Sequence, residues 1–184
     1  MDARARLLTE ATRQFVERGF AGTSMQQIAA ACGVTKAALY YHYAGKADLL
    51  LDIVRGYLDE VAGVVARAAA GAGAGEQLRA VVAGLFALPV GSRAVMRLAM
   101  HDLRHLPEDR RAAFASQYHE RFLRPLTAIV EGGMDDGTFA RRDPATVVWM
   151  LLGMLYPFFS GRARDDEEQV IDDLVAVLLT GLSA

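Results

Sequence analysis

Apolar side chains recur along almost the whole chain at the three- and four-residue spacing of a helix. In the first segment Leu7, Leu8, Ala11, Phe15 and Val16 fall on one helical face. We find no sustained alternation of apolar and polar residues, which is typical of strands, and no Asn-Gly hairpin turn. The pattern predicts an all-α protein.

Capping residues divide the N-terminal part into short helices. Gly19 can end the first helix in the left-handed conformation. Ser24 followed by Gln27 forms a capping box at the start of a second helix. Gly33 ends that helix, and Thr35 caps a third. The expected helices here, with a long one after them, cover residues 25–32, 36–43 and 46–70.

Glycine and proline set the boundaries farther along the chain. The stretch 71–75, Gly-Ala-Gly-Ala-Gly, predicts a linker. Pro89, Pro107 and Pro144 stand where helices begin or end. Pro157 lies inside an apolar run and is expected to kink or end its helix. The expected helices of this part cover residues 76–88, 92–106, 107–132, 143–160 and 165–182.

Composition and charge narrow the function classes. The chain has 184 residues, of which 53% are hydrophobic and 23% charged, so a packed core is expected and wholesale disorder is excluded. The net charge is −2, but residues 1–50 carry six Lys and Arg against four Asp and Glu, while the remainder carries fourteen against eighteen. A nucleic-acid contact is therefore expected at the N-terminal end.

Cysteine and hydropathy indicate a cytoplasmic protein. Cys32 is the only cysteine, so an internal disulfide is excluded. The N-terminal residues lack the apolar segment of a signal peptide. The longest uncharged run, 144–161, approaches the length of a membrane span but contains Gly153 and Pro157, and we interpret it as a buried helix.

Residues 24–43 carry the functional signal. Two short helices are joined by a tight turn at residues 33–35, Ala29 is small where they must cross, and Leu39 can lock the crossing. This is the helix-turn-helix pattern, which places its second helix in the major groove of DNA. Lysine supplies charge for phosphates, and tyrosine hydroxyls donate to phosphate oxygens. The second helix presents Lys36, Tyr40, Tyr41 and His42, and Lys46 follows it.

Several short sequence motifs also occur at fixed spacings within residues 5–55. They are FVERGF at Phe15–Phe20, Thr23–Ser24, Ile28–Ala29, Gly33–Val34, and KAALYYHY at Lys36–Tyr43, followed by Lys46 and Leu49–Leu50. In these motifs the chain resembles the TetR family of transcriptional repressors. The family often has Gly or Pro and then a small polar residue where this chain has Ala37 and Ala38, so no operator sequence is predicted.

The resemblance implies an N-terminal three-helix helix-turn-helix DNA-binding domain, residues 1–47, followed by a helical-bundle ligand-binding and dimerisation domain, residues 48–184. It implies a repressor released from a near-palindromic operator when a small, largely apolar ligand binds. Tyr43 is expected to pack in the core. The expected DNA contacts are Ser24, Gln26, Thr35, Lys36, Ala37, Tyr40, Tyr41, His42 and Lys46.

Aromatic residues and methionines of the second half are candidates for the wall of the implied ligand cavity. For any single one of them a filled core is the simpler interpretation, while a cavity formed by the set as a whole is what the resemblance implies. The candidates are Leu85, Phe86, Met96, Met100, Phe114, Tyr118, Phe122, Trp149, Met150, Met154, Tyr156 and Phe159.

The last two helices carry more apolar surface than a monomer can expose. Residues 147–159 are apolar nearly all round the expected helix, and residues 170–182 form a second expected helix that is rich in apolar side chains. Two such helices per subunit predict a four-helix interface in a homodimer, which suits half-sites about 34–36 Å apart. The expected interface residues are Val147, Leu151, Leu155, Val170, Leu174, Val177 and Leu178.

Other interpretations stay open beside these. His101 and His105 share a helical face and could bind zinc with His119, but two histidines do not make a site, and we expect neither a metal nor a cofactor. Cys32 is either a buried apolar residue or a redox-sensing thiol.

Two alternative functions also stand beside the ligand-released repressor. One is a DNA-binding dimer without a small-molecule inducer, controlled by a protein partner or by its abundance. The other, more remote, is a helical enzyme or ligand-binding protein. The catalytic motifs Gly-x-Ser-x-Gly and His-Glu-x-x-His and the phosphate-binding loop are not in the sequence.

Overall fold

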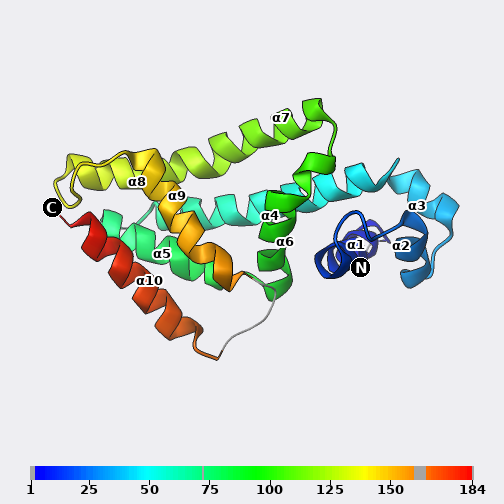
Figure 1. Cartoon of the computed structure of the whole chain (residues 1–184), viewed down its shortest axis with the longest axis horizontal. Helices are drawn as coiled ribbons and strands as arrows, with labels where there is room; N and C mark the ends of the chain where they lie inside the picture. The colour runs from blue at the N-terminus through cyan, green and yellow to red at the C-terminus, as the bar shows by residue number, and fades with distance from the viewer. Residues whose placement is uncertain (1–2, 72, 160–164, 184) are drawn as a thin grey trace. The chain divides into compact units, whose positions relative to one another are not determined.

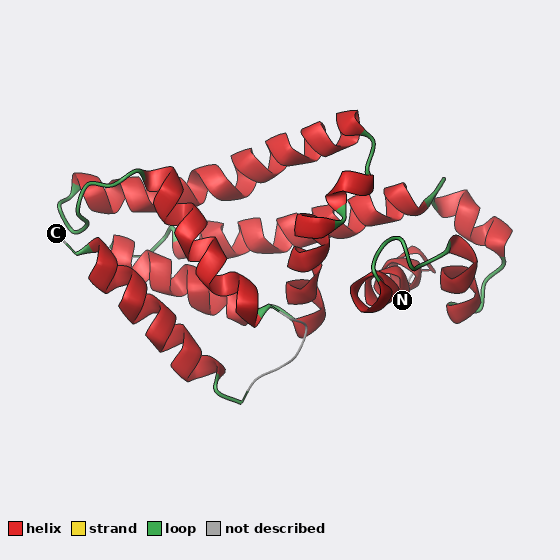
Figure 2. Ribbon diagram, in the orientation of Figure 1, coloured by secondary structure: helices red, strands yellow, loops and turns green. Residues whose placement is uncertain are grey.

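A computed structural model of the chain describes residues 3–71, 73–159 and 165–183. Within these ranges the chain forms α-helices joined by loops and short 3-10 and π turns, and its β pairing is limited to an isolated bridge between Phe139 and Ser183. Figure 2 shows helices and loops but no strand in the part that the structure describes. The predicted all-α class is confirmed.

The described residues divide into two compact units, which share several helices along the chain (Figure 1). The first unit runs from the N-terminal end to Tyr57 and includes Ala94–Ala115, and the second contains Leu58–Arg93 and the residues from Ser116 onward. The predicted functional division between residues 47 and 48 stays a prediction. The helices that continue from one unit into the other are α4 (Lys46–Ala68), α6 (Val90–His101) and α7 (Glu108–Tyr118).

The first unit begins with a three-helix core. The expected apolar face of α1 (Ala3–Arg18) is confirmed, because Leu7, Ala11 and Phe15 are buried. Two short helices pack in sequence after it, α2 (Met25–Ala31) on α1 and α3 (Lys36–His42) on α2. The start of α4, the end of α6, the 3-10 turn η1 (Leu103–His105) and the start of α7 complete the unit.

The second unit is a helical bundle. Its helices pack α5 on α8 and α10, α8 on α9, and α9 on α10. At Gly133, in α8, an added Cβ would lie 2.3 Å from the Phe139 ring and 2.7 Å from Ala74, so glycine permits this close approach. The further elements are α5 (Ala74–Phe86), the π turn η2 (His119–Leu123), α8 (Arg124–Asp135), α9 (Pro144–Leu155), η3 (Tyr156–Phe158) and α10 (Glu167–Leu182).

Proline explains the main departure from the predicted helices. Residues 107–132 were expected to form one helix, but the π turn η2 separates α7 from α8. Pro125 has no N–H and clashes with the carbonyl four residues earlier in an α-helix. The wider turn before it, in which the Arg124 N–H donates to the His119 carbonyl, accommodates that proline. Pro157, as expected, lies where α9 ends.

Two further boundaries differ slightly from the prediction. The helix expected from residue 92 to 106 begins at Val90 and ends at His101, with η1 following as a separate turn. The predicted linker 71–75 is shorter, because α5 begins at Ala74, and residue 72 lies outside the described residues.

Among the described residues, no single helix is long and apolar enough to cross a bilayer. The pair α5 and α6 meets the criterion of length and composition together, but it is bent by 99° at the break.

Candidate nucleic-acid interface

Local hydrogen bonds fix the starts of α2 and α3. The Ser24 hydroxyl accepts from the Gln27 N–H at 3.2 Å, and the Gln27 side-chain oxygen accepts from the Ser24 N–H at 2.8 Å. The predicted capping box is therefore present. The Thr35 hydroxyl accepts from the Ala38 N–H at 3.1 Å and caps α3 in the same way. These caps begin both helices at the positions that the sequence predicted.

The turn between the two helices needs glycine. Gly33 has φ +66°, a left-handed conformation that other residues rarely adopt. The Val34 N–H then donates to the Ala29 carbonyl at 3.0 Å, which closes the end of α2. Ile28, Ala29 and Leu39 are buried at the crossing of the helices. The pair is thus a helix-turn-helix with a locked angle.

The side chains left outside this locked frame form the recognition face. Tyr41 is 87% exposed and Tyr40 is 44% exposed. The Lys36 ammonium lies 5.6 Å from the centre of the Tyr40 ring, and the rings of Tyr41 and His42 meet edge to face at 5.3 Å. The recognition face consists of the exposed residues Ser24, Gln26, Thr35, Lys36, Ala37, Tyr40, Tyr41 and His42.

Lys46, the ninth expected DNA contact, is half-buried and holds the protein itself. Its ammonium donates to the Phe20 carbonyl at 2.8 Å and to the Thr23 carbonyl at 2.7 Å. It also lies 4.5 Å from the centre of the Phe20 ring. An ammonium has three donors, so Lys46 fastens the loop before α2 to α4 while one N–H is left over.

Tyr43 is buried, as expected, and carries a polar network that the sequence did not indicate. Its hydroxyl accepts from Arg4 Nε at 3.1 Å and donates to Asp52 at 2.9 Å, and Arg4 pairs with Asp52 at 2.6 Å. Burial raises the pKa of Tyr43 to about 12. The network joins α1, the end of α3 and α4, and therefore fixes the orientation of the recognition helix.

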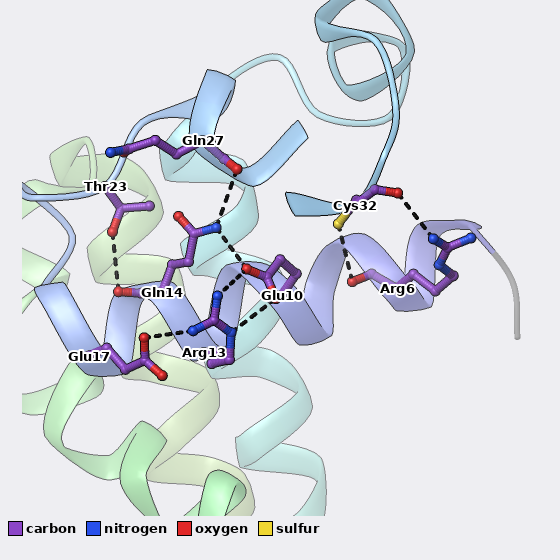
Figure 3. Close-up of polar contacts among 8 residues, drawn as sticks. All are labelled: Arg6, Glu10, Arg13, Gln14, Glu17, Thr23, Gln27 and Cys32. Atoms are coloured by element: carbon purple, nitrogen blue, oxygen red, sulfur yellow. Dashed lines mark hydrogen bonds and ion pairs between the residues drawn. The ribbon is translucent and has the colours of Figure 1, made fainter. Parts of the chain in front are cut away.

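Helix α1 supports α2 through a second network (Figure 3). The side-chain amide of buried Gln14 donates to Glu10 at 2.8 Å and to the Gln27 backbone carbonyl at 3.4 Å. The backbone carbonyl of Gln14 accepts from the Thr23 hydroxyl at 3.2 Å. Nearer the start of α1, Arg6 donates to the Cys32 carbonyl at 3.0 Å. Both ends of α2 are thus hydrogen-bonded to α1.

Residues 94–115, from a distant part of the sequence, contact α1, the loop after it and the start of α4. The His105 ring stacks on Phe20 with the centres 5.0 Å apart and the planes 15° apart. Arg97 donates to the Val16 carbonyl at 2.8 Å, and Arg110 forms an ion pair with Asp48 at the start of α4. The Phe20 ring therefore lies between His105 and the Lys46 ammonium.

Neither Cys32 nor the histidines form a reactive or metal-binding cluster within the described residues. Cys32 is buried, burial raises the pKa of its thiol, and the thiol donates to the Arg6 carbonyl at 3.8 Å. His105 lies 3.6 Å from Asp102, and His119 lies 3.4 Å from Glu120. The structure shows no group of three or more metal-ligating side chains in the ranges that it describes.

The predicted pocket residues are divided between the two units, and their role in a pocket stays a prediction. Met96, Met100 and Phe114 belong to the first unit and the others to the second. A hollow of the second unit is lined by Arg79, Ala83, Ile171, Gln169 and four acids. The predicted set divides into buried residues (Leu85, Phe86, Phe114, Phe122, Phe159), half-buried residues (Met96, Tyr118, Met154, Tyr156) and exposed residues (Met100, Trp149, Met150).

The two helices that were expected to dimerise expose apolar side chains, but most of these are not the predicted interface residues. Val177 is 64% exposed and Val170 is half-buried. Helix α9 exposes Trp149 at 56% and Met150 at 62%. Five predicted interface residues are instead buried within the single chain, where they fill its own core: Val147, Leu151, Leu155, Leu174 and Leu178.

Comparison with known proteins adds an independent finding to this geometry. A family model described as bacterial regulatory proteins, tetR family, matches residues 7–53. A second model, described as the C-terminal domain of tetracyclin repressor-like proteins, matches residues 71–182.

Individual relatives agree with the family models. HTH-type transcriptional repressor KstR2 of Rhodococcus jostii is 28% identical over 137 residues, which are 74% of this chain and 67% of that protein. The crystal structure of the regulator PfmR from Thermus thermophilus has a TM-score of 0.85, is 26% identical, and the match covers 97% of this chain and 100% of that one. AibR in complex with isovaleryl coenzyme A and operator DNA has a TM-score of 0.82 and is 30% identical, with 96% and 97% covered.

Proposed function

The chain belongs to the TetR family of bacterial transcriptional regulators, and from that premise we propose that it is a homodimeric repressor released from a near-palindromic operator by a small effector. Its relatives are DNA-binding transcriptional regulators rather than enzymes. We place DNA binding in residues 1–47, effector binding and dimerisation in residues 48–184, and the protein in the cytoplasm.

The recognition face is the observation that carries the proposal. Its side chains are exposed on two helices whose starts, turn and crossing are all fixed by local bonds. Lys36 supplies charge for a phosphate, Tyr40 and Tyr41 supply hydroxyls and ring edges, and Ala37 offers a methyl group for apolar contact with a base. A rigid frame suits this task, because the readout of base edges requires side chains in fixed positions.

Release by an effector requires a path from the second unit to the recognition face. Helices α4, α6 and α7 each continue from one unit into the other. On the first unit, α6 and η1 hold α1 through Arg97 and hold Phe20 through His105. An effector that prefers another arrangement of these helices changes the spacing of the two recognition helices in a dimer. A hundredfold loss of operator affinity needs about 2.7 kcal/mol of differential effector binding.

The first experiment is selection of random DNA duplexes by the purified full-length protein at two salt concentrations. We expect an enriched near-palindrome and an affinity that falls steeply as salt rises, because lysine–phosphate contacts release counterions. Tyr41→Ala is expected to lose the enrichment while the protein stays folded and dimeric. Folded, dimeric protein that enriches no sequence would contradict the proposal.

The effector is tested separately from DNA binding. A thermal-shift screen with apolar metabolites should yield a ligand that raises the melting temperature and lowers operator affinity. A ligand that binds tightly without changing operator affinity would refute release by that ligand. Sequence-selective binding with no response to any metabolite would favour the alternative of a dimer controlled by a protein partner or by its abundance.

A further inference from the structure

The second unit contains a buried charge that DNA binding does not use. Arg93, on α6, has a side chain that is only 5% exposed. Its Nη1 donates to Oε1 of Glu167, at the start of α10, over 2.8 Å. Its Nε is buried and has no hydrogen-bond partner among the described residues. Burying a donor without a partner is costly, so the Nε–H of Arg93 is available to donate to an oxygen of a ligand.

An aromatic cluster lies beside this arginine. The guanidinium carbon lies 5.8 Å from the centre of the Phe86 ring, at the end of α5. Phe86 in turn packs edge to face on Phe159 at 5.5 Å and in a tilted arrangement on Phe158 at 6.1 Å. Phe86 and Phe159 are both buried. The arginine thus stands at the edge of an apolar wall made from α5 and the segment that follows α9.

The geometry of the guanidinium indicates which kind of group fits. Arginine presents two edges to oxygen acceptors, one of which is formed by Nε and Nη2 and matches a carboxylate or phosphate. Glu167 holds Nη1, so its carboxylate leaves Nε unpaired. An amphipathic anion would satisfy the unpaired donor with its head and contact the rings with its apolar part.

We propose that Arg93 recognises the anionic head of the effector. The effector is a small amphipathic carboxylate or phosphate: its head binds the Nε edge of Arg93, and its apolar body packs against Phe86 and Phe159. This inference rests on the proposed function, because it specifies the chemical class of the effector. Glu167 stays on Nη1, where its negative charge offsets part of the guanidinium charge and repels the anionic head.

The test is isothermal titration of the full-length protein with hexanoate, decanoate, phenylacetate and octyl phosphate, and with the primary amides of the three acids. At least one anion should bind, and each acid that binds should do so at least about tenfold more tightly than its amide, as expected for a charge-assisted hydrogen bond. Tighter binding of octyl phosphate would identify the head as a phosphate, and tighter binding of an acid would identify it as a carboxylate.

Three variants separate recognition from structure. Arg93→Met should bind an acid and its amide equally, whereas Glu167→Gln should bind the acid more tightly than the wild type because a neighbouring negative charge is gone. Arg79→Met is the matched control, since Arg79 pairs with Asp172 of α10 at 2.7 Å with both side chains about half exposed, and it should leave every affinity unchanged.

Several outcomes would overturn the inference. These are the absence of binding by all four anions, equal affinity of acid and amide for the wild type, or an acid preference that survives in folded Arg93→Met. If Arg93→Met does not fold, an unchanged acid affinity in Glu167→Gln is decisive against it. Duplex selection with the same wild-type preparation separates the two ideas: selection without anion binding refutes only the anion site, and failed selection refutes the regulator.

Discussion

At the scale of single residues, Lys46 is both an expected phosphate contact and a support for the loop before α2. Its ammonium is bonded to the carbonyls of Phe20 and Thr23 and lies over the Phe20 ring. The expected phosphate contact must therefore come from the remaining N–H. Helix α4 begins at this residue, so the lysine that is expected to contact DNA also holds the loop that leads into α2.

Lys46→Met tests this double role, with Lys36→Met as the matched control. Both substitutions should weaken binding to every duplex and reduce the slope of log affinity against log salt by about 0.9. Only Lys46→Met should lower the free energy of unfolding, by about 1–3 kcal/mol, because it leaves two carbonyls without their charged donor. Urea titration measures this, and equal stabilities of the two variants would show that the Lys46 bonds do not support the loop.

Tyr43 gives a pH prediction. Its pKa is raised from 10 to about 12 by burial, so in that range the folded protein keeps a proton that the unfolded chain loses. The stability that this group contributes is complete below pH 10 and is lost as the pH rises toward 12. Unfolding free energies measured across this range should fall less steeply in Tyr43→Phe than in the wild type.

Exposed Tyr41 provides the comparison for that experiment. Tyr41→Phe removes a hydroxyl from a ring that is 87% exposed, so the pH dependence should equal that of the wild type. At neutral pH Tyr43→Phe should cost about 1 kcal/mol, since the hydroxyl bonds to Arg4 and Asp52 are lost. If the two variants had the same pH dependence, Tyr43 would not be the titrating group.

At the scale of secondary-structure elements, the turn between α2 and α3 depends on one glycine. Gly33 has φ +66° and an added Cβ would meet nothing within 4 Å, so the only penalty of a side chain is conformational. Gly33→Ala should therefore destabilise the protein by about 1–2 kcal/mol, and Gly33→Asn by less, because asparagine adopts this conformation more readily.

Gly132 is the control for this element. It lies in α8 with an ordinary φ and open space around it. Gly132→Ala should stabilise the protein by about 0.5–1 kcal/mol through its higher helix propensity. Urea unfolding curves measure both glycines, and a Gly33→Ala variant as stable as the wild type would contradict the left-handed turn.

At the scale of the whole molecule, dimerisation decides whether two recognition helices act together. The exposed apolar residues Trp149, Met150 and Val177 lie on α9 and α10, the helices that the sequence assigned to the interface. Large apolar residues in such a position favour contact with a second copy. We therefore propose these side chains, rather than the buried ones beside them, as contacts of the dimer.

Trp149→Glu and Val177→Glu test that surface. Each should convert the dimer to a monomer in sedimentation velocity and abolish cooperative binding to a palindrome, because a charge would be buried at the contact. Met100→Glu changes another exposed apolar residue, 58% exposed on α6, and should leave the oligomeric state unchanged. A dimer that persists in both α9 and α10 variants would place the interface elsewhere.

The sequence by itself determined the features that depend on neighbours a few residues away. The capping residues Ser24 and Thr35 set where α2 and α3 begin, and Gly33 set the turn between them. With these fixed, helical spacing determines which side chains of α3 point outward. Eight of the nine expected DNA contacts are exposed and Lys46 is half-buried, and their contact with DNA stays a prediction. Pro125, also visible in the sequence, was not recognised as the cause of a π turn.

Only the tertiary structure decided which distant groups meet. The Lys46 bonds span 26 and 23 residues, the Arg4–Asp52 pair 48, and the Arg93–Glu167 pair 74. Residues 94–115 likewise belong to the first unit rather than to the second. Periodicity shows that a helix has an apolar face, but it leaves open which apolar residues the chain itself covers, because that depends on how the helices pack.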